Sequence, residues 1–273
     1  MSGVPLKLAV VAGEVSGDLL GGDLAAALKR RYDGPVELVG VGGEALEAQG
    51  LHSLFDYSEL SIMGFIQVIK RLPKLLARIR QTADAIIAAK PDVLLIIDSP
   101  DFTHRVAKRV RKALPNLPVV NYVCPSVWAW KEYRAQQMLA YVDHVLAVLP
   151  FEPGAMQRLG GPATTYVGHR LTVDANLVEA RRQRELRGLP DAEAQKTILL
   201  LPGSRASEIR HLLPVFEQAT EELSRRNNNM RFVLPTVPRQ EALVRSLTGH
   251  WKIKPDILVG QDAKWSAFAQ ADA

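Results

Sequence analysis

The sequence has very few side chains of the kinds that hold metals or form cross-links. It contains 273 residues with one cysteine, Cys124, and six histidines. A single thiol excludes an intrachain disulfide framework and a cysteine-rich zinc module, and the histidines show neither H-x-H nor H-E-x-x-H spacing. We therefore expect no metal and no other cofactor, and we expect Cys124 to be packed in the core rather than to act as a nucleophile.

Long apolar runs are lacking as well. No run approaches the roughly 18 residues that a membrane-spanning helix needs, and residues 6–13 are too short and too weakly preceded by cations for a secretory signal. The hydrophobic fraction of 47% and the charged fraction of 23% are typical of a folded protein and exclude a disordered chain. The net charge of +5 leaves nucleic acid, an anionic membrane surface and a phosphorylated substrate open as partners.

Short apolar strands alternate with amphipathic helices along most of the chain. Strands are predicted at 8–12, 36–41, 92–97, 119–123, 144–149, 197–201 and 231–234. Because strands that are apolar on both faces need helices on both sides, the pattern predicts an α/β protein with parallel sheets. The charged stretch 171–195 carries no strand signal and is predicted to link a first lobe, 1–170, to a second lobe, 196–273. The second lobe is about half a typical α/β domain, so we expect it to be incomplete.

The turn after the first strand carries the polar residues Glu14, Ser16 and Asp18. Open parallel sheets bind ligands at the carboxyl ends of their strands, which makes this turn a candidate site. Its spacing matches neither G-x-G-x-x-G, nor G-x-S-x-G, nor a P-loop. Ser16 and Asp18 have an alternative role as helix N-cap and dipole partner. Glu14 has no such capping role, so we predict that it lies in the site.

Asp98 ends the most apolar strand, and we predict that it is a general base. A partly desolvated carboxylate at the carboxyl edge of a sheet suits that role. Pro100 is expected to hold Ser99 in an extended conformation. Asp101 opens the next helix, where an N-cap is the alternative to a role in binding.

Two further segments are candidates for substrate binding. The turn at 202–205 brings Ser204 and Arg205 to a helix start, where backbone amides and a guanidinium can hold a phosphate; an ordinary turn with a surface arginine is the alternative. Trp128 and Trp130 follow a strand edge, where they can line a pocket or pack in the core.

The segment from Ile62 to Arg80 combines apolar residues at helical spacing with cations, and no acidic residue lies between Glu59 and Asp84. A basic amphipathic helix of this kind is typical of an element that lies on a membrane surface. The alternative is a helix that covers the sheet, and Pro73 is expected to kink it. The residues predicted to contact the membrane are Ile62, Phe65, Ile66, Ile69, Lys70, Arg71, Lys74 and Arg78.

A series of short motifs, taken in order, resembles the lipid-A-disaccharide synthase family. The motifs are AGE and SGD within 12–18, GVGG at 40–43, SIMG at 61–64, IDSPDF at 97–102, PSVWAW at 125–130, LPFE at 149–152, VGH at 167–169 and LPGSR at 201–205. The resemblance runs from residue 8 to the last residue, and PSVWAW is its most specific string.

The resemblance implies an α/β protein with two Rossmann-like lobes of the GT-B type. It implies an inverting transferase that joins UDP-2,3-diacylglucosamine to 2,3-diacylglucosamine 1-phosphate (lipid X) and releases UDP, in lipid A biosynthesis. It also implies a cytoplasmic protein, peripheral on the inner face of the inner membrane, and allows a homo-oligomer of the full-length protein. In the family the second lobe continues with residues that help hold UDP, so these 273 residues alone are expected to be inactive.

Carried over to this sequence, the resemblance makes Asp98 the base that takes the proton of the acceptor 6-hydroxyl and adds Glu14 as a second catalytic residue. Without a metal, Arg205 and the amides of its turn would stabilise the departing UDP. The substrate-binding residues would be Ser16, Asp101, Trp128, His169, Ser204 and Arg205.

Two other interpretations stay open at this point. A UDP-N-acetylglucosamine 2-epimerase-like enzyme shares the two-lobe fold but does not need a basic amphipathic face. A non-catalytic, membrane-associated module that binds a lipid-linked sugar is the second. Nucleic acid is not expected as a partner, because the basic residues are spread over helices with no strand of interleaved aromatics.

Overall fold

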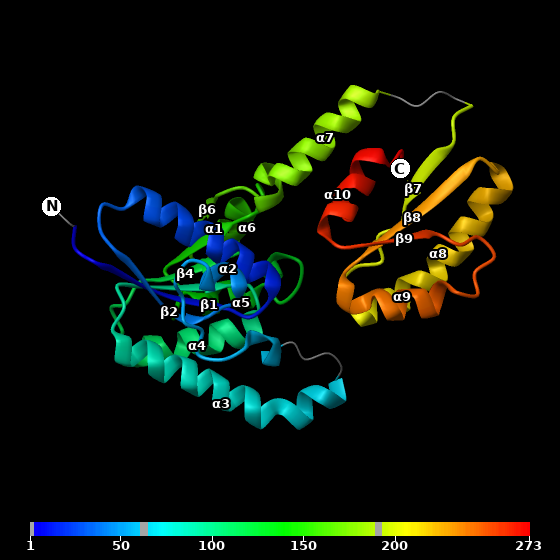
Figure 1. The fold of residues 1–273 in the computed structure, drawn as a ribbon. Helices are drawn as coiled ribbons and strands as arrows, with labels where there is room; N and C mark the ends of the chain where they lie inside the picture. Colours follow the sequence, from blue (N-terminus) through cyan, green and yellow to red (C-terminus); the bar gives the residue numbers. More distant parts are fainter. Residues whose placement is uncertain (1–2, 61–64, 189–192) are drawn as a thin grey trace. The chain divides into compact units, whose positions relative to one another are not determined.

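The computed structural model describes residues 3–60, 65–188 and 193–273. The chain divides into two compact units, Met1–Arg170 and Leu171–Ala273, and each is built on a parallel sheet (Figure 1). The α/β fold class expected from the sequence is thus confirmed.

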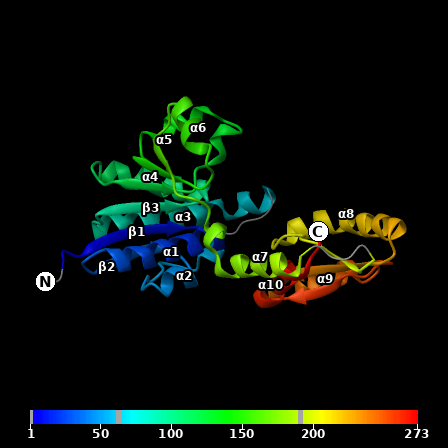
Figure 2. The same ribbon diagram turned by 90° about the horizontal axis from the view of Figure 1, so that it is seen from above.

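The first unit contains a parallel sheet of six strands in the order β2-β1-β3-β4-β5-β6. Figure 2 shows β2, β1 and β3 in this order. The strands are β1 (Leu6–Ala12), β2 (Val36–Val41), β3 (Val93–Ile97), β4 (Val119–Tyr122), β5 (His144–Ala147) and β6 (Ala163–Tyr166). The order reverses between β1 and β3, which pair directly from Leu8↔Val93 to Ala12↔Ile97. The crevice outside such a reversal is where open parallel sheets bind ligands.

Both faces of this sheet are covered by helices, which explains why its strands are apolar without alternation. In β1, Ala9 and Val11 belong to one buried cluster, whereas Val10 and Ala12 belong to the cluster on the other face. One face carries α1 (Val15–Arg31) and α2 (Glu44–Glu47), and the other carries α3 (Phe65–Ala89), α4 (Pro100–Ala113), α5 (Tyr133–Met138) and α6 (Glu152–Arg158).

Asp18 on α1 has a structural role that differs from the predicted one. Its buried carboxylate accepts hydrogen bonds from the backbone N–H groups of Gly43 at 2.7 Å, Ala45 at 2.9 Å and Leu46 at 3.2 Å. Three amides at the start of α2 are thereby satisfied by a side chain from another helix. Asp18 is therefore a cap for α2 rather than a dipole partner within α1 alone.

Helix α3 is continuous through Pro73. Two of its cations, Lys74 and Arg78, have an acidic partner. Glu59 lies 3.2 Å from Lys74 and 2.8 Å from Arg78, and the Arg78 guanidinium also lies 4.5 Å from the centre of the Phe55 ring. No acidic residue lies between Glu59 and Asp84 in the sequence, but Glu59 itself, just before the helix, pairs with Lys74 and Arg78. Ile62 lies outside the described residues, as do the side chains of Phe65, Ile66, Ile69, Lys70 and Arg71. Within the described ranges, no helix is both long and apolar enough to cross a membrane.

The second unit contains a smaller parallel sheet in the order β7-β8-β9. Its elements are β7 (Lys196–Leu199), α8 (Ala206–Arg226), β8 (Met230–Thr236), α9 (Glu241–Thr248), β9 (Asp256–Val259) and α10 (Gln261–Gln270). Leu213 of α8 and Val244 of α9 pack with Trp251 in the core of this unit. After α10 the chain runs along β7, where Thr197 and Leu199 form backbone hydrogen bonds with Asp272 and Ala273.

The predicted linker, 171–195, is largely part of the second unit. It contains α7 (Ala175–Arg187), which packs against α10. Asp174 caps this helix by accepting hydrogen bonds from the N–H groups of Asn176 and Leu177. The sequence prediction missed the helix because its residues are mostly charged and leave only a weak apolar face.

Candidate functional site

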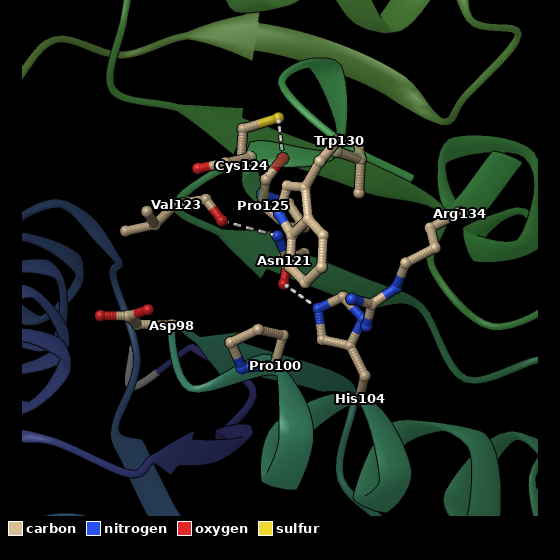
Figure 3. Close-up of a pocket in the computed structure, with 11 residues that line it drawn as sticks. Asp98, Pro100, His104, Asn121, Val123, Cys124, Pro125, Trp130 and Arg134 are labelled. Carbon is tan, nitrogen blue, oxygen red and sulfur yellow. Dashed lines mark hydrogen bonds between the residues drawn. The ribbon is translucent and has the colours of Figure 1, made fainter. Parts of the chain in front are cut away.

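A cavity of about 280 Å³ opens at the carboxyl ends of β3 and β4 in the first unit (Figure 3). It lies next to the reversal in strand order, where the topology favours ligand binding. The residues that line it are Asp98, Pro100, His104, Asn121, Val123, Cys124, Pro125, Ser126, Val127, Trp130 and Arg134.

Asp98 directly follows β3, and the backbone around it is strained. Asp98 has φ 50° and Ser99 has φ 44°, so two successive non-glycine residues are left-handed. The expectation that Pro100 holds Ser99 extended was wrong. Hydrogen bonds override the preference of the proline: the Thr103 hydroxyl donates to the carbonyl of Asp98 at 2.7 Å and to that of Ser99 at 3.2 Å. Strain of this kind tends to collect at functional sites.

The Asp98 carboxylate is half-buried and held on both of its oxygens. Oδ1 accepts a hydrogen bond from the N–H of Ser99 at 2.8 Å, and Oδ2 accepts one from the Ser16 hydroxyl at 3.3 Å. Ser16 therefore does not cap its own helix; the N-cap position of α1 is taken by Glu14, whose side chain makes no capping bond. A Cβ on Gly13 would lie 2.8 Å from the side chain of Ser99, so this turn needs glycine to pack against Asp98-Ser99.

Glu14 and Asp98 follow neighbouring strands, as the sequence predicts. Ala12 is paired with Ile97 across β1 and β3; Asp98 directly follows Ile97, and Glu14 follows Ala12 after one glycine. Glu14 is half-buried. The structure thus brings both predicted catalytic carboxylates, together with Ser16, to the same edge of the sheet.

A buried chain of hydrogen bonds lies behind the cavity. Nδ1 of His104 lies 3.0 Å from the Tyr141 hydroxyl, and Nε2 lies 3.2 Å from Oδ1 of Asn121. The Asn121 amide donates to the carbonyl of Val123 at 2.9 Å. Because Asn121 thus offers its oxygen to the ring, Nε2 carries the proton and Nδ1 accepts from Tyr141. The chain ends on Val123, a β-branched residue with φ 73°, and holds the cavity wall in this uncommon conformation.

Burial fixes the ionisation of the groups along this wall. It is the main cause that lowers the pKa of His104 from 6.5 to about 4, with repulsion by Arg134 and Lys108 as smaller contributions in the same direction. Burial and, to a smaller extent, the negative charge of Glu152 raise the pKa of the Cys124 thiol to about 12. The thiol is therefore protonated, and Cys124 is buried as the sequence predicts.

Of the two tryptophans, Trp130 lines the cavity and Trp128 does not. Trp128 lies in a short 3-10 helix, Ser126–Trp128, and packs edge-on against Phe151 at 4.8 Å. Its indole N–H donates to the buried carboxylate of Glu152 at 3.4 Å. This arrangement corresponds to the core-packing alternative, whereas Trp130 is exposed at the rim.

Asp101 and His169 are not among the residues that line this cavity. Asp101 is exposed in the first turn of α4. The N-cap of α4 is Ser99 and not Asp101, because the left-handed turn starts the helix two residues earlier. His169 is exposed near the end of the first unit, after β6.

A second cavity, of about 410 Å³, lies at the carboxyl ends of the strands of the second unit. It is lined by Leu201, Pro202, Gly203, Ser204, Pro235, Thr236, Val237, Pro238, Gly260 and Lys264. Thr236 is 6% exposed, and its buried hydroxyl has no hydrogen-bond partner among the residues that the structure describes. A buried hydroxyl without a partner costs free energy unless a ligand or water pairs with it.

Arg205 is the N-cap residue of α8, directly after Ser204. The Glu208 carboxylate receives hydrogen bonds from the Arg205 guanidinium at 2.9 Å and from the Arg205 N–H at 3.3 Å. The guanidinium hydrogen bond is the main cause that lowers the pKa of Glu208. Gly203 has φ 90°, and a Cβ there would lie 2.3 Å from the same carboxylate. An acidic side chain thus covers the amides that were predicted to hold a phosphate.

His104, Asn121 and Arg134 were not predicted as site residues. Phe102, Val106 and Val110 share one side of α4, and at about 3.6 residues per turn position 104 falls on the other side, so helical spacing gives no signal for the burial of His104. Asn121 stands in an apolar strand, and its burial follows from that position. Nothing local to Arg134 indicates that it lines the cavity.

Comparison with known proteins identifies the family. The profile described as lipid-A-disaccharide synthetase matches residues 8–273. A lipid-A-disaccharide synthase of Nitrobacter winogradskyi is 51% identical over 98% of this chain and 67% of its own length. One from Rhodopseudomonas palustris (strain HaA2) is 49% identical over 100% of this chain and 68% of its own length. The chain thus spans about two thirds of the length of these relatives.

Solved structures share the fold at low sequence identity. UDP-GlcNAc 2-epimerase from Neisseria meningitidis, bound to UDP-GlcNAc, matches with a TM-score of 0.59 at 13% identity, over 98% of this chain and 76% of that one. The S. aureus MnaA–UDP co-structure gives 0.58 at 14% identity, over 98% and 72%. These likenesses concern the fold alone, the two-lobe GT-B arrangement that the sequence predicts. The sequence matches go further: the chain belongs to the lipid-A-disaccharide synthase family.

Proposed function

We propose that the chain is an inverting glycosyltransferase of lipid A biosynthesis, which joins UDP-2,3-diacylglucosamine to lipid X and releases UDP. The family match of about 50% identity over nearly the whole chain carries this proposal. It favours the synthase over the epimerase-like enzyme and the non-catalytic module. The cavity beside Asp98 supplies the acceptor site that such a reaction needs.

The proposed mechanism uses Asp98 as the general base. The carboxylate takes the proton of the acceptor 6-hydroxyl as that oxygen forms a bond to the anomeric carbon of the donor. The bond from that carbon to the UDP oxygen breaks, and UDP leaves with the electron pair. Hydrogen bonds from Ser99 and Ser16 fix the direction of the carboxylate, and a fixed base is more effective than a mobile one. Glu14, at the end of the next strand, is the second carboxylate of this site.

The second cavity is the proposed site for the UDP part of the donor. Its turn presents Ser204 and the start of helix α8, where backbone N–H groups and the helix dipole would favour phosphate once the competing Glu208 carboxylate is displaced. Arg205 adjoins this turn and would stabilise the leaving diphosphate. The unpaired hydroxyl of Thr236 and the cation of Lys264 are further groups that a nucleotide can engage.

The acyl chains of both substrates require contact with a bilayer. The basic amphipathic helix α3 is the proposed element, and its amino-terminal half carries the cations Lys70 and Arg71. Lys74 and Arg78 contribute less to this contact, because Glu59 neutralises part of their charge. Co-sedimentation with anionic vesicles tests the proposal: replacing Lys70 and Arg71 with Gln should weaken binding at low salt. Equal binding by the variant would make α3 only a cover for the sheet.

The deciding experiment for the function is a transfer assay. UDP-2,3-diacylglucosamine and lipid X are incubated with a protein of the full length that the relatives have, and the disaccharide is measured by mass spectrometry. Asp98→Asn should reduce the rate about 10²- to 10⁴-fold, the usual effect of losing a general base.

A matched control is Asp92→Asn, which removes an equal charge just before the other end of β3 and should leave the rate within a few-fold. The absence of disaccharide with the unaltered protein would refute the function. A normal rate with Asp98→Asn would refute only the role of that residue.

A further inference from the structure

Arg134 is a cation of the first cavity that no step of the proposed mechanism uses. It lies on α5, is half-buried and lines the cavity together with Asp98. Figure 3 shows Asp98 and Arg134 on opposite sides of the cavity, with Pro100 and Asn121 between them. The guanidinium is close enough to His104 and Tyr141 to influence both groups electrostatically.

The surroundings of Arg134 do not neutralise its charge. Among the residues that the structure describes, no carboxylate forms an ion pair with it, whereas Arg109, Arg111 and Arg170 in the same unit all have one. The neighbouring His104 ring is kept neutral mainly by burial, which lowers its pKa to about 4. A half-buried guanidinium without a counter-ion is unfavourable, and an anionic ligand removes that cost.

The charges of the cavity match the two ends of a sugar phosphate. The acceptor has a 6-hydroxyl, whose proton must reach a base, and a 1-phosphate; the two groups extend from C5 and C1, the two carbons on either side of the ring oxygen. Asp98 supplies the base on one side and Arg134 the cation on the other. A cavity of about 280 Å³ is near the lower end of the usual range for ligand sites, which suits a single sugar phosphate headgroup with its acyl chains outside.

Two neutral residues complete the headgroup site. Ser126 is exposed at the lining and can donate its hydroxyl to a phosphate oxygen. Trp130 is 59% exposed at the rim and offers an aromatic face to a pyranose ring. Lys131, which lies 4.2 Å from the centre of the Trp130 ring, adds a second positive charge near the mouth.

We infer that Arg134 binds the 1-phosphate of the acceptor and selects for phosphorylated acceptors. The inference rests on the proposed function, because it needs the acceptor in this cavity. Its planar guanidinium can bind two phosphate oxygens through two parallel N–H groups, a geometry that the single ammonium of lysine does not offer. Arg134 is thus a specificity-determining residue, and it sets the sugar so that its 6-hydroxyl faces Asp98.

Binding to the chain of 273 residues tests this inference, since the cavity lies wholly within its first unit. The probes are lipid X and 2,3-diacylglucosamine without the phosphate, each in mixed micelles. Arg134→Gln should weaken lipid X binding about 10- to 100-fold, the usual effect of losing hydrogen bonds to a charged group. It should leave the binding of the unphosphorylated lipid unchanged, and Arg134→Lys should restore part of the lost affinity.

The control is Arg105→Gln, which removes an equal charge from the exposed side of α4 and should bind both lipids as the unaltered chain does. If Arg134→Gln lowered the affinity for both lipids equally, the role of Arg134 would be merely structural. If it lowered neither affinity, Arg134 would not belong to the site. If the variant instead lost affinity for UDP, the cavity would hold the donor phosphate and the inference would be wrong. Failure of the unaltered chain to bind lipid X would also overturn it. The function itself is judged separately, by disaccharide formation in the transfer assay.

Discussion

Acidification is expected to destabilise the first unit through one residue, His104. Its imidazole is 5% exposed and uses both nitrogens in hydrogen bonds, one to Tyr141 and one to Asn121. A second proton on the ring would turn Nδ1 from an acceptor into a donor and break its bond with the Tyr141 hydroxyl, unless that hydroxyl turned. The charged ring would also be buried near the cations Arg134 and Lys108, and the hydrogen bond to Asn121 and the charge of Asp101 would compensate only part of that cost.

The size of this effect follows from the pKa of His104. Burial lowers the pKa in the folded state from 6.5 to about 4, so the folded state binds this proton more weakly than the unfolded chain. The neutral ring therefore contributes its full stability above pH 6.5, and that contribution is lost as the pH falls towards 4. A tenfold change in proton affinity is worth about 1.4 kcal/mol, so the total loss is about 3 kcal/mol. This is a large part of the stability of an ordinary domain, about 5–15 kcal/mol.

Two measurements on His104 check this prediction. Long-range ¹H–¹⁵N spectra report the tautomer and should show the proton on Nε2 at pH 7. Hydrogen exchange of peptides from β3 to β5, at pH 7, 6, 5 and 4.5, gives the free energy of opening for the first unit alone. Tryptophan fluorescence would not separate the units, because both contain tryptophan.

His104→Gln provides the matched comparison, because its side chain is neutral at every pH and can still form a hydrogen bond. The variant should be less stable than the unaltered chain at pH 7, and the difference should shrink by about 2–3 kcal/mol on going to pH 4.5. A pKa of His104 near 6.5, or a difference that does not change with pH, would refute the reasoning.

The second cavity supports two further predictions, both measured as UDP binding by calorimetry. Glu208→Gln should tighten UDP binding about 2- to 5-fold, because it frees Arg205 and the amides of its turn from a competing carboxylate. Arg205→Ala should weaken UDP binding. Weaker binding by Glu208→Gln and tighter binding by Arg205→Ala would refute the competition between Glu208 and UDP. Thr236→Val removes the buried, unpaired hydroxyl. The substitution should stabilise the unliganded chain slightly. If the hydroxyl pairs with the nucleotide, the substitution should weaken UDP binding about 3- to 10-fold, because one hydrogen bond contributes a net gain of about 1 kcal/mol. Unchanged UDP affinity would exclude that contact.

The sequence predicts those parts of the site that depend only on chain order and hydropathy. The apolar runs before Glu14 and Asp98 predict two parallel strands, and the carboxyl ends of such strands lie at the same edge. That edge is where the structure places both residues. The same reasoning predicts the turn with Ser204 and Arg205 in the second unit.

Other parts depend on contacts between distant residues and could not be predicted in the same way. The rule for a residue before proline predicts an extended Ser99, yet hydrogen bonds from Thr103 hold it left-handed. Helical spacing places His104 away from Phe102, Val106 and Val110, so its burial depends on partners that come from β4 and from the segment after α5. Glu59, which neutralises part of the charge of Lys74 and Arg78, lies outside their helix, so the charge pattern of the helix does not reveal it.

The left-handed pair Asp98-Ser99 has a consequence for how this protein can be stabilised. Glycine adopts such a conformation without the steric cost that other residues bear, roughly 1–2 kcal/mol per residue. Selection for heat resistance alone should therefore favour glycine at position 99, and selection for activity should disfavour it. Ser99 donates the N–H that fixes the Asp98 carboxylate, and a more flexible residue would let that carboxylate turn away from the cavity. With Asp98 as the proposed general base, thermal stability and catalytic rate would oppose each other at this one peptide unit of the chain.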